Sequence, residues 1–364
     1  MKVLFITKNS DRPESASILG LQKKGVDVLV MADVRSEHVK RLIVAGIEVL
    51  NLPLDKKLDW KGLQRIRHEV ISRKIDIVHA FNHRAVLHMV LATRGLSTRL
   101  IAYRGVIGNV SWWSPLSWVR FLNPRIDRII CVAEGVRQYL LGLKLLRLHL
   151  DPERVITIHK GHELDWYRED PVDLATIGIP ADVMVVCCSS RLRPRKGLWE
   201  LVRALDLIDP EKNIHLLFLG HEGNSSLLGE VANLRNPERV HFAGFRTDAP
   251  AIMAAAQVCA LPVLDGEGLS RAVIEAMAYG LPAIVTPVGG NTELIVDGQC
   301  GLVVPVGDEM ALARAMERLY DDPELRQRMG RSARQRISSQ FRSSDTVDRT
   351  LSVYHAVLEE GARA

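Results

Sequence analysis

The chain has 364 residues, of which 47% are hydrophobic and 25% are charged. This composition excludes a disordered, collagenous or coiled-coil protein, and at about 100–200 residues per domain the length favours two globular domains. The formal net charge of +5 is unevenly distributed, because residues 1–170 carry 28 Lys and Arg against 18 Asp and Glu, and residues 171–364 carry 20 against 25. The basic half favours an anionic partner: nucleic acid, a membrane surface or a phosphorylated substrate.

No apolar run reaches the roughly 18 residues that a membrane-spanning helix needs. The first residues, MKVLFITKNSD, turn polar too early for a signal peptide and favour a first β-strand. We therefore expect a cytoplasmic protein. The five cysteines form no C-x-x-C pair, which favours buried packing over disulfides or metal binding.

Short apolar runs alternate with amphipathic segments along the whole chain. In the first half the runs that favour strands are 2–7, 26–31, 47–52, 75–81, 99–103 and 127–132, with helices expected at 60–74 and 134–143. In the second half the strand-like runs are 183–190, 214–220, 239–244, 258–263, 282–287 and 301–305. This alternation predicts an α/β protein with two doubly wound, Rossmann-like domains, whose parallel sheets are covered on both faces.

A polar, proline-containing stretch between about residues 165 and 181 marks the expected domain boundary. We assign residues 1–170 to the first domain and residues 171–340 to the second. The charged segment from about residue 322 to residue 360 is expected to be helical, and its last part, residues 341–364, to pack back on the first domain.

The candidate ligand-binding loops follow strands of the second half, because ligands of open parallel sheets bind beyond the carboxyl ends of the strands. The first loop, SSRLRPRKGLWE, places Arg191, Arg193, Arg195 and Lys196 directly before a helix expected to begin near Leu198. Cations are unfavourable at a helix N-terminus unless an anion binds there. The loop therefore predicts a phosphate or diphosphate site, with a solvated basic loop as the alternative.

The second loop, LDGEGLSRAVIEAMAYG, combines glycines with two carboxylates. Ser270 is the expected N-cap of a helix that carries Glu275, and Glu267 lies in the loop before it. The flexible backbone and the free N–H groups of the first helical turn suit an anionic group, and the carboxylates suit sugar or ribose hydroxyls. A third loop, TPVGGNTELI, is either a phosphate-binding turn or a plain one.

These loops resemble those of a known family. The segment EGLSRAVIE, from Glu267 to Glu275, and the sequence after it are similar to the E-x7-E region of retaining glycosyltransferases of family 4, which have the GT-B fold. RLRPRKG resembles the diphosphate loop of that family, and RVHFAGFRTD resembles its nucleobase-side segment. The resemblance is specific over about 183–310 and looser over 1–150.

The resemblance implies a retaining enzyme whose two domains face each other across a cleft. A UDP- or GDP-linked sugar donor would bind the second domain, and a glycan or lipid-linked acceptor of lipopolysaccharide or exopolysaccharide synthesis would bind the first. No cofactor and no metal ion are expected, because Arg191, Lys196 and a helix N-terminus would neutralise the diphosphate. The residues implied by motif are Gly244, Phe245 and Arg246 near the base, Glu275 at the ribose, and Glu267, Gly268, Leu269 and Ser270 at the sugar and phosphate.

The first domain departs from the family pattern at two loops. The Gly-Gly pair that is common after the first strand is replaced by Lys8-Asn9-Ser10-Asp11, and a frequent histidine is replaced by Arg104. Arg104 would stabilise the donor or bind an anionic acceptor. His79, at another strand end, is a catalytic candidate, with a hydrogen-bonded core histidine as the alternative.

Two segments of the first domain, 111–122 and 139–150, combine Trp or Leu with Lys and Arg. We favour packing in the domain core, with contact to the inner face of an anionic membrane, or a lipid-acceptor groove, as the alternative. For the whole chain, the alternative to an enzyme is a catalytically silent GT-B protein that binds a nucleotide sugar or a glycan. No motif supports nucleic-acid binding, and we expect none.

Overall fold

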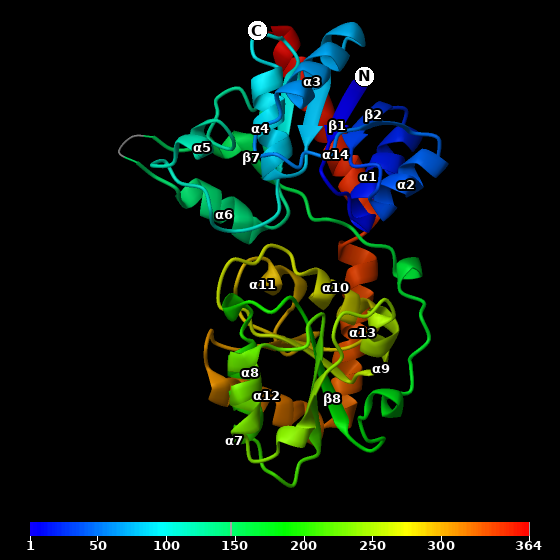
Figure 1. The fold of residues 1–364 in the computed structure, drawn as a ribbon, viewed down its shortest axis with the longest axis vertical. Helices are drawn as coiled ribbons and strands as arrows, with labels where there is room; N and C mark the ends of the chain where they lie inside the picture. Colours follow the sequence, from blue (N-terminus) through cyan, green and yellow to red (C-terminus); the bar gives the residue numbers. More distant parts are fainter. Residues whose placement is uncertain (146–147, 364) are drawn as a thin grey trace. The chain divides into compact units, whose positions relative to one another are not determined.

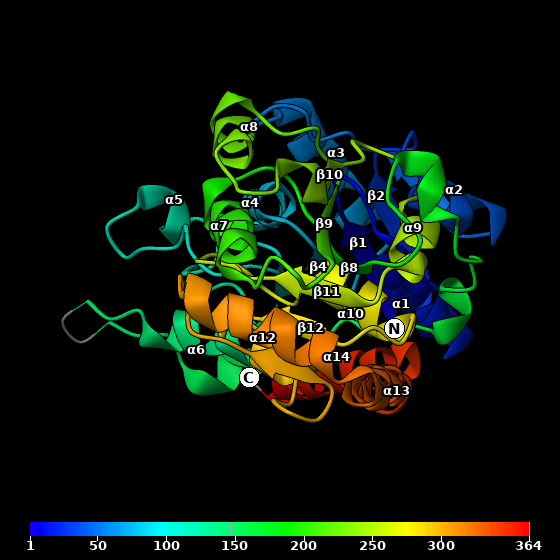
Figure 2. The ribbon, with the colours of Figure 1, turned by 90° about the horizontal axis from the view of Figure 1, so that it is seen from below.

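The computed structural model describes residues 1–145 and 148–363, which form two compact units (Figure 1). Unit 1 comprises Met1–Gly161 and Phe341–Ala364, and unit 2 comprises His162–Gln340. Each unit contains one parallel sheet, of seven strands in unit 1 and six in unit 2. Helices cover both faces of each sheet (Figure 2). The predicted fold class, α/β with two Rossmann-like sheets, is therefore confirmed.

The sheet of unit 1 has the strand order β3-β2-β1-β4-β5-β6-β7. Its strands are β1 (Lys2–Ile6), β2 (Asp27–Ala32), β3 (Glu48–Asn51), β4 (Ile77–Ala80), β5 (Arg99–Arg104), β6 (Arg128–Cys131) and β7 (Val155–Thr157). Its helices are α1 (Arg12–Lys23), α2 (Glu37–Val44), α3 (Trp60–Ser72), α4 (His83–Ala92), α5 (Pro115–Trp118), α6 (Glu134–Gly142) and α14 (Ser343–Arg363), with a 3-10 turn, η1 (Pro152–Arg154). Helices α1, α2 and α14 pack together on one face, and α3 packs with α4 on the other.

Helix α14 belongs to unit 1, although the whole of unit 2 separates it in sequence from the rest of that unit. It packs along α1, and its Tyr354 and Val357 side chains are fully buried. The Thr346 hydroxyl donates a hydrogen bond to the carbonyl of His159 and accepts one from the N–H of Gly161, both at 2.8 Å. Apolar burial and these hydrogen bonds fix α14 on the sheet of unit 1.

The sheet of unit 2 has the strand order β10-β9-β8-β11-β12-β13. Its strands are β8 (Met184–Ser189), β9 (Ile214–Leu219), β10 (Val240–Phe242), β11 (Val258–Leu261), β12 (Ala283–Val285) and β13 (Gly301–Val303). Its helices are α7 (Leu198–Leu207), α8 (Ser225–Ala232), α9 (Ala249–Ala255), α10 (Arg271–Ala278), α11 (Asn291–Leu294), α12 (Glu309–Asp321) and α13 (Pro323–Gln340), with 3-10 turns η2 (Leu164–Trp166), η3 (Leu174–Ile177), η4 (Pro194–Lys196) and η5 (Pro237–Arg239). Helices α7, α8 and α12 cover one face, and α9, α10 and α13 cover the other (Figures 1 and 2).

The predicted strands are all present, with ends that differ by up to two residues. Strand β7 has no counterpart among them, because its apolar residues are interrupted by Thr157 and form a shorter run than those that predicted the other strands. The five cysteines are free and buried, as predicted. No helix in the described part of the chain is long and apolar enough to cross a membrane.

The Trp-rich segment of unit 1, residues 111–122, is only partly in the core. Trp112 and Phe121 are buried, which agrees with the favoured interpretation. Trp113 is 82% exposed and Leu116 is 54% exposed, so core packing is wrong for these two side chains. The segment lies in the connection between β5 and β6 and contains only the one-turn helix α5, so no helical period directs its apolar side chains to one face.

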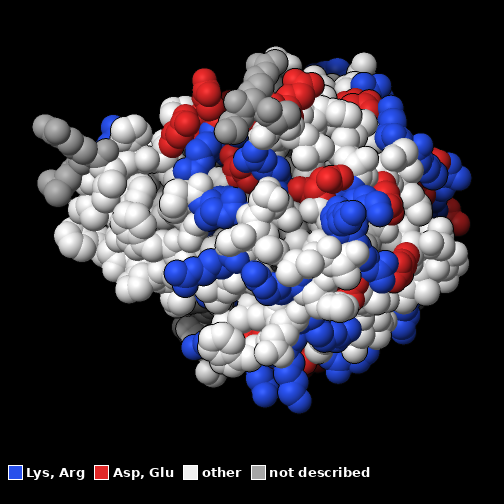
Figure 3. All heavy atoms as spheres, turned by 90° about the horizontal axis from the view of Figure 1, so that it is seen from above, with Lys and Arg blue, Asp and Glu red and all other residues white. Residues whose placement is uncertain are grey.

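The second apolar segment, residues 139–150, is also divided. Leu140 and Leu150 are buried, whereas Leu148 is 44% exposed. Residues 146–147 lie outside the described residues. The basic side chains gather in several groups on the face shown in Figure 3, separated by uncharged and acidic surface.

Candidate functional site

A cavity of about 450 Å³ lies at the carboxyl ends of the unit 2 strands. The strand order reverses between β8 and β11, since the chain proceeds from β8 to β9 and later returns to the other side of β8. Loops that follow the two strands at such a switch point leave on opposite faces and open a crevice. The predicted residues that line the cavity are Arg191, Lys196, Phe245, Arg246, Glu267, Ser270 and Glu275.

The loop after β8 brings Lys196 into the cavity. It turns through η4 and ends at Gly197, which has φ +73° and begins α7. A Cβ atom at Gly197 would lie 1.9 Å from the carbonyl oxygen of Pro262, so only glycine permits this approach to the end of β11. The N–H of Leu264 also donates to the carbonyl of Arg195 at 2.8 Å. The basic loop and the acidic loop are therefore held together by their backbones.

Lys196 and Glu267 form an ion pair across the cavity floor. Their side chains are 18% and 13% exposed, and the second carboxylate oxygen of Glu267 accepts from the N–H of Gly268 at 3.2 Å. A cation and a carboxylate withdrawn from water in this way stabilise each other, because each replaces part of the hydration that the other lost. An incoming diphosphate would compete with Glu267 for Lys196.

The Gly289-Gly290 turn supports the acidic loop from behind and is absent from the cavity lining. The N–H of Gly290 donates to the carbonyl of Gly268 at 2.6 Å, and a Cβ atom at Gly289 would lie 2.5 Å from the carbonyl oxygen of Glu267. With that N–H occupied, the turn serves to position Glu267. This geometry favours the plain turn over a phosphate-binding one.

Helix α10 presents its N-terminus and Glu275 to the cavity. Ser270 is its N-cap residue, but its side chain makes no capping hydrogen bond, so the first-turn N–H groups are not satisfied by it. Burial raises the pKa of Glu275, the charge of Arg271 opposes this shift, and the charge of Glu169 adds to it. Arg271 Nε lies 3.2 Å from Glu275 Oε1. A half-buried carboxylate with a raised pKa gains from hydroxyl donors that complete its hydrogen bonds.

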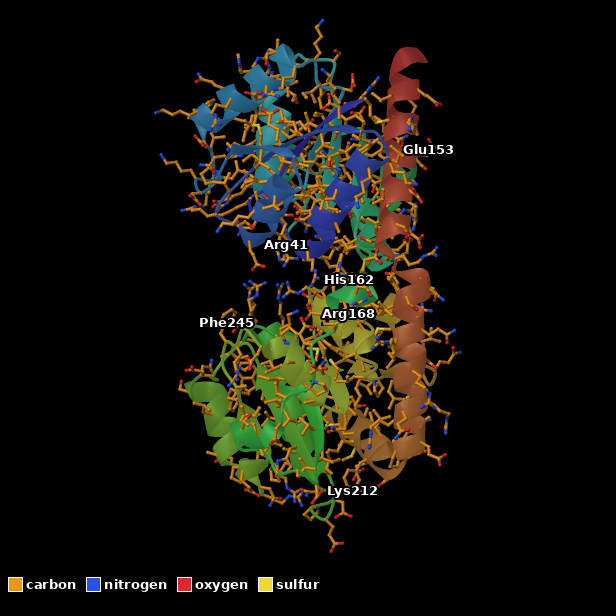
Figure 4. All side chains as sticks on the ribbon, turned by 90° about the vertical axis from the view of Figure 1, so that its right-hand side faces the viewer. Arg41, Glu153, His162, Arg168, Lys212 and Phe245 are labelled. Atoms are coloured by element: carbon orange, nitrogen blue, oxygen red, sulfur yellow. The ribbon has the colours of Figure 1, made fainter. Side chains whose placement is uncertain are left out.

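The loop after β10 forms the opposite wall. Phe245 is 85% exposed, and its ring projects from the loop (Figure 4). Arg246 donates to both carboxylate oxygens of Asp248, at 2.8 and 2.6 Å. The carbonyl of Gly244 accepts from the N–H of Gly220 at 2.9 Å, which ties this loop to the end of β9. An exposed ring beside a cavity is a stacking surface for a planar ligand.

Three predicted residues, Gly244, Gly268 and Leu269, flank the cavity without lining it. Arg271 lines the cavity and was not predicted; its position four residues before Glu275 on one helix was the available signal. Apolar residues from β9, α9 and β11 were also not predicted, because their sequence pattern is that of the core. They are Leu219, Pro250, Met253 and Leu261.

His79 belongs to unit 1, where it is a core residue. Its side chain is 2% exposed, its Nδ1 atom lies 2.7 Å from the hydroxyl oxygen of Tyr354, and its ring stacks on Phe81 at 4.4 Å between centroids. Burial lowers the pKa of His79 to about 3, so the imidazole is neutral near pH 7. This placement favours the hydrogen-bonded core histidine over the catalytic interpretation.

Arg104 also belongs to unit 1 and is 6% exposed. Its guanidinium donates to the carbonyl of Gly108 and lies over the ring of Phe121, with 4.9 Å between the guanidinium carbon and the ring centroid. The cavity of unit 2 contains neither Arg104 nor His79. In the described residues, no group of three or more His, Cys, Asp or Glu side chains is arranged to hold a metal ion.

Family models match most of the chain. Residues 171–336 match the model of glycosyl transferases group 1, and residues 18–166 match the model of glycosyltransferase family 4. The chain belongs to glycosyltransferase family 4. The residues that line the cavity lie within the match to glycosyl transferases group 1. Arg104 and His79 lie within the match to glycosyltransferase family 4.

This family 4 chain is similar in sequence to two curated relatives and in fold to one solved structure. It is 32% identical over 197 residues to the N-acetyl-alpha-D-glucosaminyl L-malate synthase of Bacillus anthracis, covering 54% of this chain and 51% of the relative. It is 27% identical over 321 residues to the lipopolysaccharide core biosynthesis glycosyltransferase LpsE of Rhizobium meliloti, covering 86% of this chain and 82% of the relative. The chain therefore matches about half of the first relative's length and most of the second's.

The solved structure is Anabaena Alr3699/HepE in complex with UDP, which is also known with UDP-glucose. It matches this family 4 chain with a TM-score of 0.78 at 21% identity, covering 98% of this chain and 100% of the other. At this identity the match establishes a shared fold.

Proposed function

We propose that this chain transfers a sugar from a UDP-linked donor to a glycan or lipid-linked acceptor, with retention of the anomeric configuration. The observation that carries the proposal is the gathering of Arg191, Lys196, Glu267 and Glu275 around one cavity at the switch point of the unit 2 sheet. The structurally similar Anabaena protein binds UDP and UDP-glucose, which supports UDP over GDP as the first donor to test.

The cations of the cavity would hold the diphosphate of the donor. Arg191 is exposed and forms no ion pair with any described residue, and Lys196 would exchange Glu267 for a phosphate oxygen. The N-terminus of α10 adds positive potential at the same place. These charges stabilise the negative charge that develops on the leaving diphosphate, which is the role that a metal ion has in other transferases.

The carboxylates would hold the sugars of the donor. Once a phosphate oxygen takes its place beside Lys196, Glu267 can accept hydrogen bonds from donor-sugar hydroxyls, and Glu275 from ribose hydroxyls. The leaving phosphate oxygen would take the proton of the acceptor hydroxyl as the new bond forms on the same face of the sugar. This route requires no protein base, which is consistent with the burial of His79.

An acceptor of the lipopolysaccharide type is supported by the match to LpsE over most of both chains. Contact with an anionic membrane is supported by exposed apolar side chains in the connection between β5 and β6. Val106 is 41% exposed, Trp113 82% and Leu116 54%, and basic residues lie in the same segment. Large apolar side chains beside basic ones favour the interfacial region of a membrane.

The first experiment compares the thermal stability of the full chain with UDP, GDP and ADP. A ligand at 100 times its Kd stabilises the native state by about 2.7 kcal/mol. We expect UDP to raise the Tm of the wild type and to have little effect on Glu275→Ala. Glu324→Ala, which removes a carboxylate of unit 2 whose side chain is 90% exposed, is the matched control and should respond like the wild type.

The second experiment measures the release of UDP from UDP-glucose with and without a lipid-linked oligosaccharide acceptor. Transfer to the acceptor supports the enzyme. UDP binding without any turnover across a panel of donors and acceptors would instead support the catalytically silent protein. No stabilisation by any nucleotide would contradict the donor site itself.

A further inference from the structure

Three arginines of unit 1, Arg84, Arg104 and Arg120, form what we call the arginine cluster. The sheet register pairs Ala80 of β4 with Ala102 of β5, so the segments that follow the two strands leave from the same edge of the sheet. Arg84 lies in the first turn of α4, and Arg104 is the last residue of β5. Arg120 precedes Phe121, whose ring the Arg104 guanidinium covers. The carboxyl ends of neighbouring parallel strands are where ligands bind.

The guanidinium groups of the cluster are incompletely bonded. The Nε atoms of Arg104 and Arg120 are buried and have no hydrogen-bond partner among the described residues. Nη1 of Arg84 donates to the carbonyls of Leu54 and Asp55, at 2.9 and 2.8 Å, which leaves its other donors available. None of the three arginines forms an ion pair with a described Asp or Glu.

Other arginines at the edges of the unit 1 sheet are satisfied. Arg99 pairs with Asp127 at 3.0 Å. Arg154 donates to the carbonyl of Ile126 at 3.0 Å and to that of Asn123 at 2.9 Å. Buried polar groups are normally bonded, so the bare Nε atoms of the cluster require an explanation.

The surroundings of the cluster disfavour the charged form of its side chains, so a bound anion would be stabilised there. Burial lowers the pKa of Arg104; Tyr139 and Cys131 oppose this shift, and the charge of Arg120 adds to it. Burial also lowers the pKa of Arg120, and the charge of Arg84 lowers it further. The pKa of His83 is lowered by burial and then by all three arginines. The N-terminus of α4 adds its own positive potential, and its first turn contains no acidic residue.

We propose that the arginine cluster binds a phosphate group carried by the acceptor. This inference rests on the proposed function, because it names the chemical class of the acceptor: a phosphorylated sugar or a phosphate-linked glycan. The site belongs to unit 1 and is separate from the diphosphate loop of unit 2.

The geometry favours guanidinium groups over the backbone as the donors. The side chain of Asn82 already accepts from the N–H groups of Arg84 and Ala85, so the start of α4 has little backbone left to offer. A phosphate presents several oxygens and suits a set of guanidinium forks approaching from different elements. A neutral hydroxyl would leave the mutual repulsion of the arginines uncompensated.

The test is a calorimetric titration of the full chain, saturated with UDP, with glucose 1-phosphate and separately with glucose. We expect glucose 1-phosphate to bind and glucose to bind at least tenfold more weakly. Arg120→Gln and Arg84→Gln should each raise the Kd for glucose 1-phosphate at least tenfold. Arg94→Gln, which removes one exposed positive charge from the same unit, should change it less than twofold. Using two variants protects the test against one that fails to fold.

The proposal is overturned if glucose 1-phosphate does not bind, or if both variants bind it as the wild type does. It is also overturned if vesicles containing phosphatidylglycerol, and not glucose 1-phosphate, show the dependence on Arg120, because the cluster would then bind lipid headgroups. If the proposed donor site is wrong, the chain will not bind UDP, which is a different result from those above. The arginine variants can then still be compared with the wild type by titrating glucose 1-phosphate without UDP.

Discussion

Variants of the ion pair between Lys196 and Glu267 allow an effect on the stability of the chain to be distinguished from an effect on donor binding. Lys196→Met keeps the length of the side chain and removes its charge, leaving a carboxylate that is 13% exposed with only the N–H of Gly268 as partner. Breaking an ion pair that is withdrawn from water by removing one partner costs about 3–5 kcal/mol of unfolding free energy. For a unit of this size we expect the Tm to fall by about 2–4 °C for each kcal/mol.

The double variant Lys196→Met/Glu267→Gln removes both charges and nearly preserves the volume. Replacing both partners of a withdrawn pair is close to neutral, so we expect its unfolding free energy to return to within about 1 kcal/mol of the wild type. The affinity for UDP should not return, since the diphosphate has lost a cation. Losing one such charge-assisted contact costs about 1.5–3 kcal/mol, or roughly a 10- to 150-fold increase in Kd.

Thermal unfolding followed by circular dichroism and calorimetric titration with UDP provide the two measurements. Lys212→Met/Asp321→Asn is the matched control, because this unit 2 pair is more exposed, at 20% and 56%, and lies outside the cavity lining. Exposed pairs contribute about 0–1 kcal/mol, so its stability and its UDP affinity should change little. The reasoning would be refuted by a double variant that regains wild-type UDP affinity together with its stability.

Three further changes test other parts of unit 2. Gly197→Ala should lower the unfolding free energy by at least about 2 kcal/mol, measured by denaturant titration, because its Cβ would lie 1.9 Å from the Pro262 carbonyl oxygen at a positive φ; unchanged stability would contradict the close approach. His215 Nδ1 lies 2.9 Å from His241 Nε2, and burial followed by the charge of His241 lowers the pKa of His215 to about 4. Between about pH 6.5 and 4 the unfolded chain binds more protons than the folded one, so stability should fall as the pH falls through that window. His215→Phe should make this fall in stability less steep, as measured by thermal unfolding at each pH. Phe245→Ala should leave the Tm unchanged, because the ring is 85% exposed, and weaken UDP binding; equal titration curves would remove Phe245 from the base site.

The strands and the loops of the cavity could be predicted from the sequence, for a physical reason. Strands buried on both faces read as continuous apolar runs, and polar or glycine-rich segments directly after them mark the carboxyl edge of the sheet. Arg191, Lys196, Glu267 and Glu275 all lie in or directly after such segments, and the structure places them around one cavity.

Pairings between distant segments could not be predicted in this way. Glu267 is 71 residues from Lys196, and Tyr354 is 275 residues from His79. The strand-end position of His79 suggested a functional side chain, and only the tertiary packing of α14 shows that its ring is enclosed. The prediction for Trp113 was wrong for the opposite reason. Its apolar surroundings in the sequence suggested the core, but it lies in a connection without helical or strand period and is exposed.

The discontinuity of unit 1 has a consequence for biosynthesis. The face of α1 that receives α14, and the imidazole of His79 that bonds to Tyr354, are synthesised before unit 2, whereas α14 is synthesised after it. A nascent chain folds from its N-terminal side as it emerges. Unit 2, being continuous, can close on the ribosome while unit 1 still exposes apolar surface, so we expect chaperones that bind nascent chains to engage the α1 face until α14 emerges.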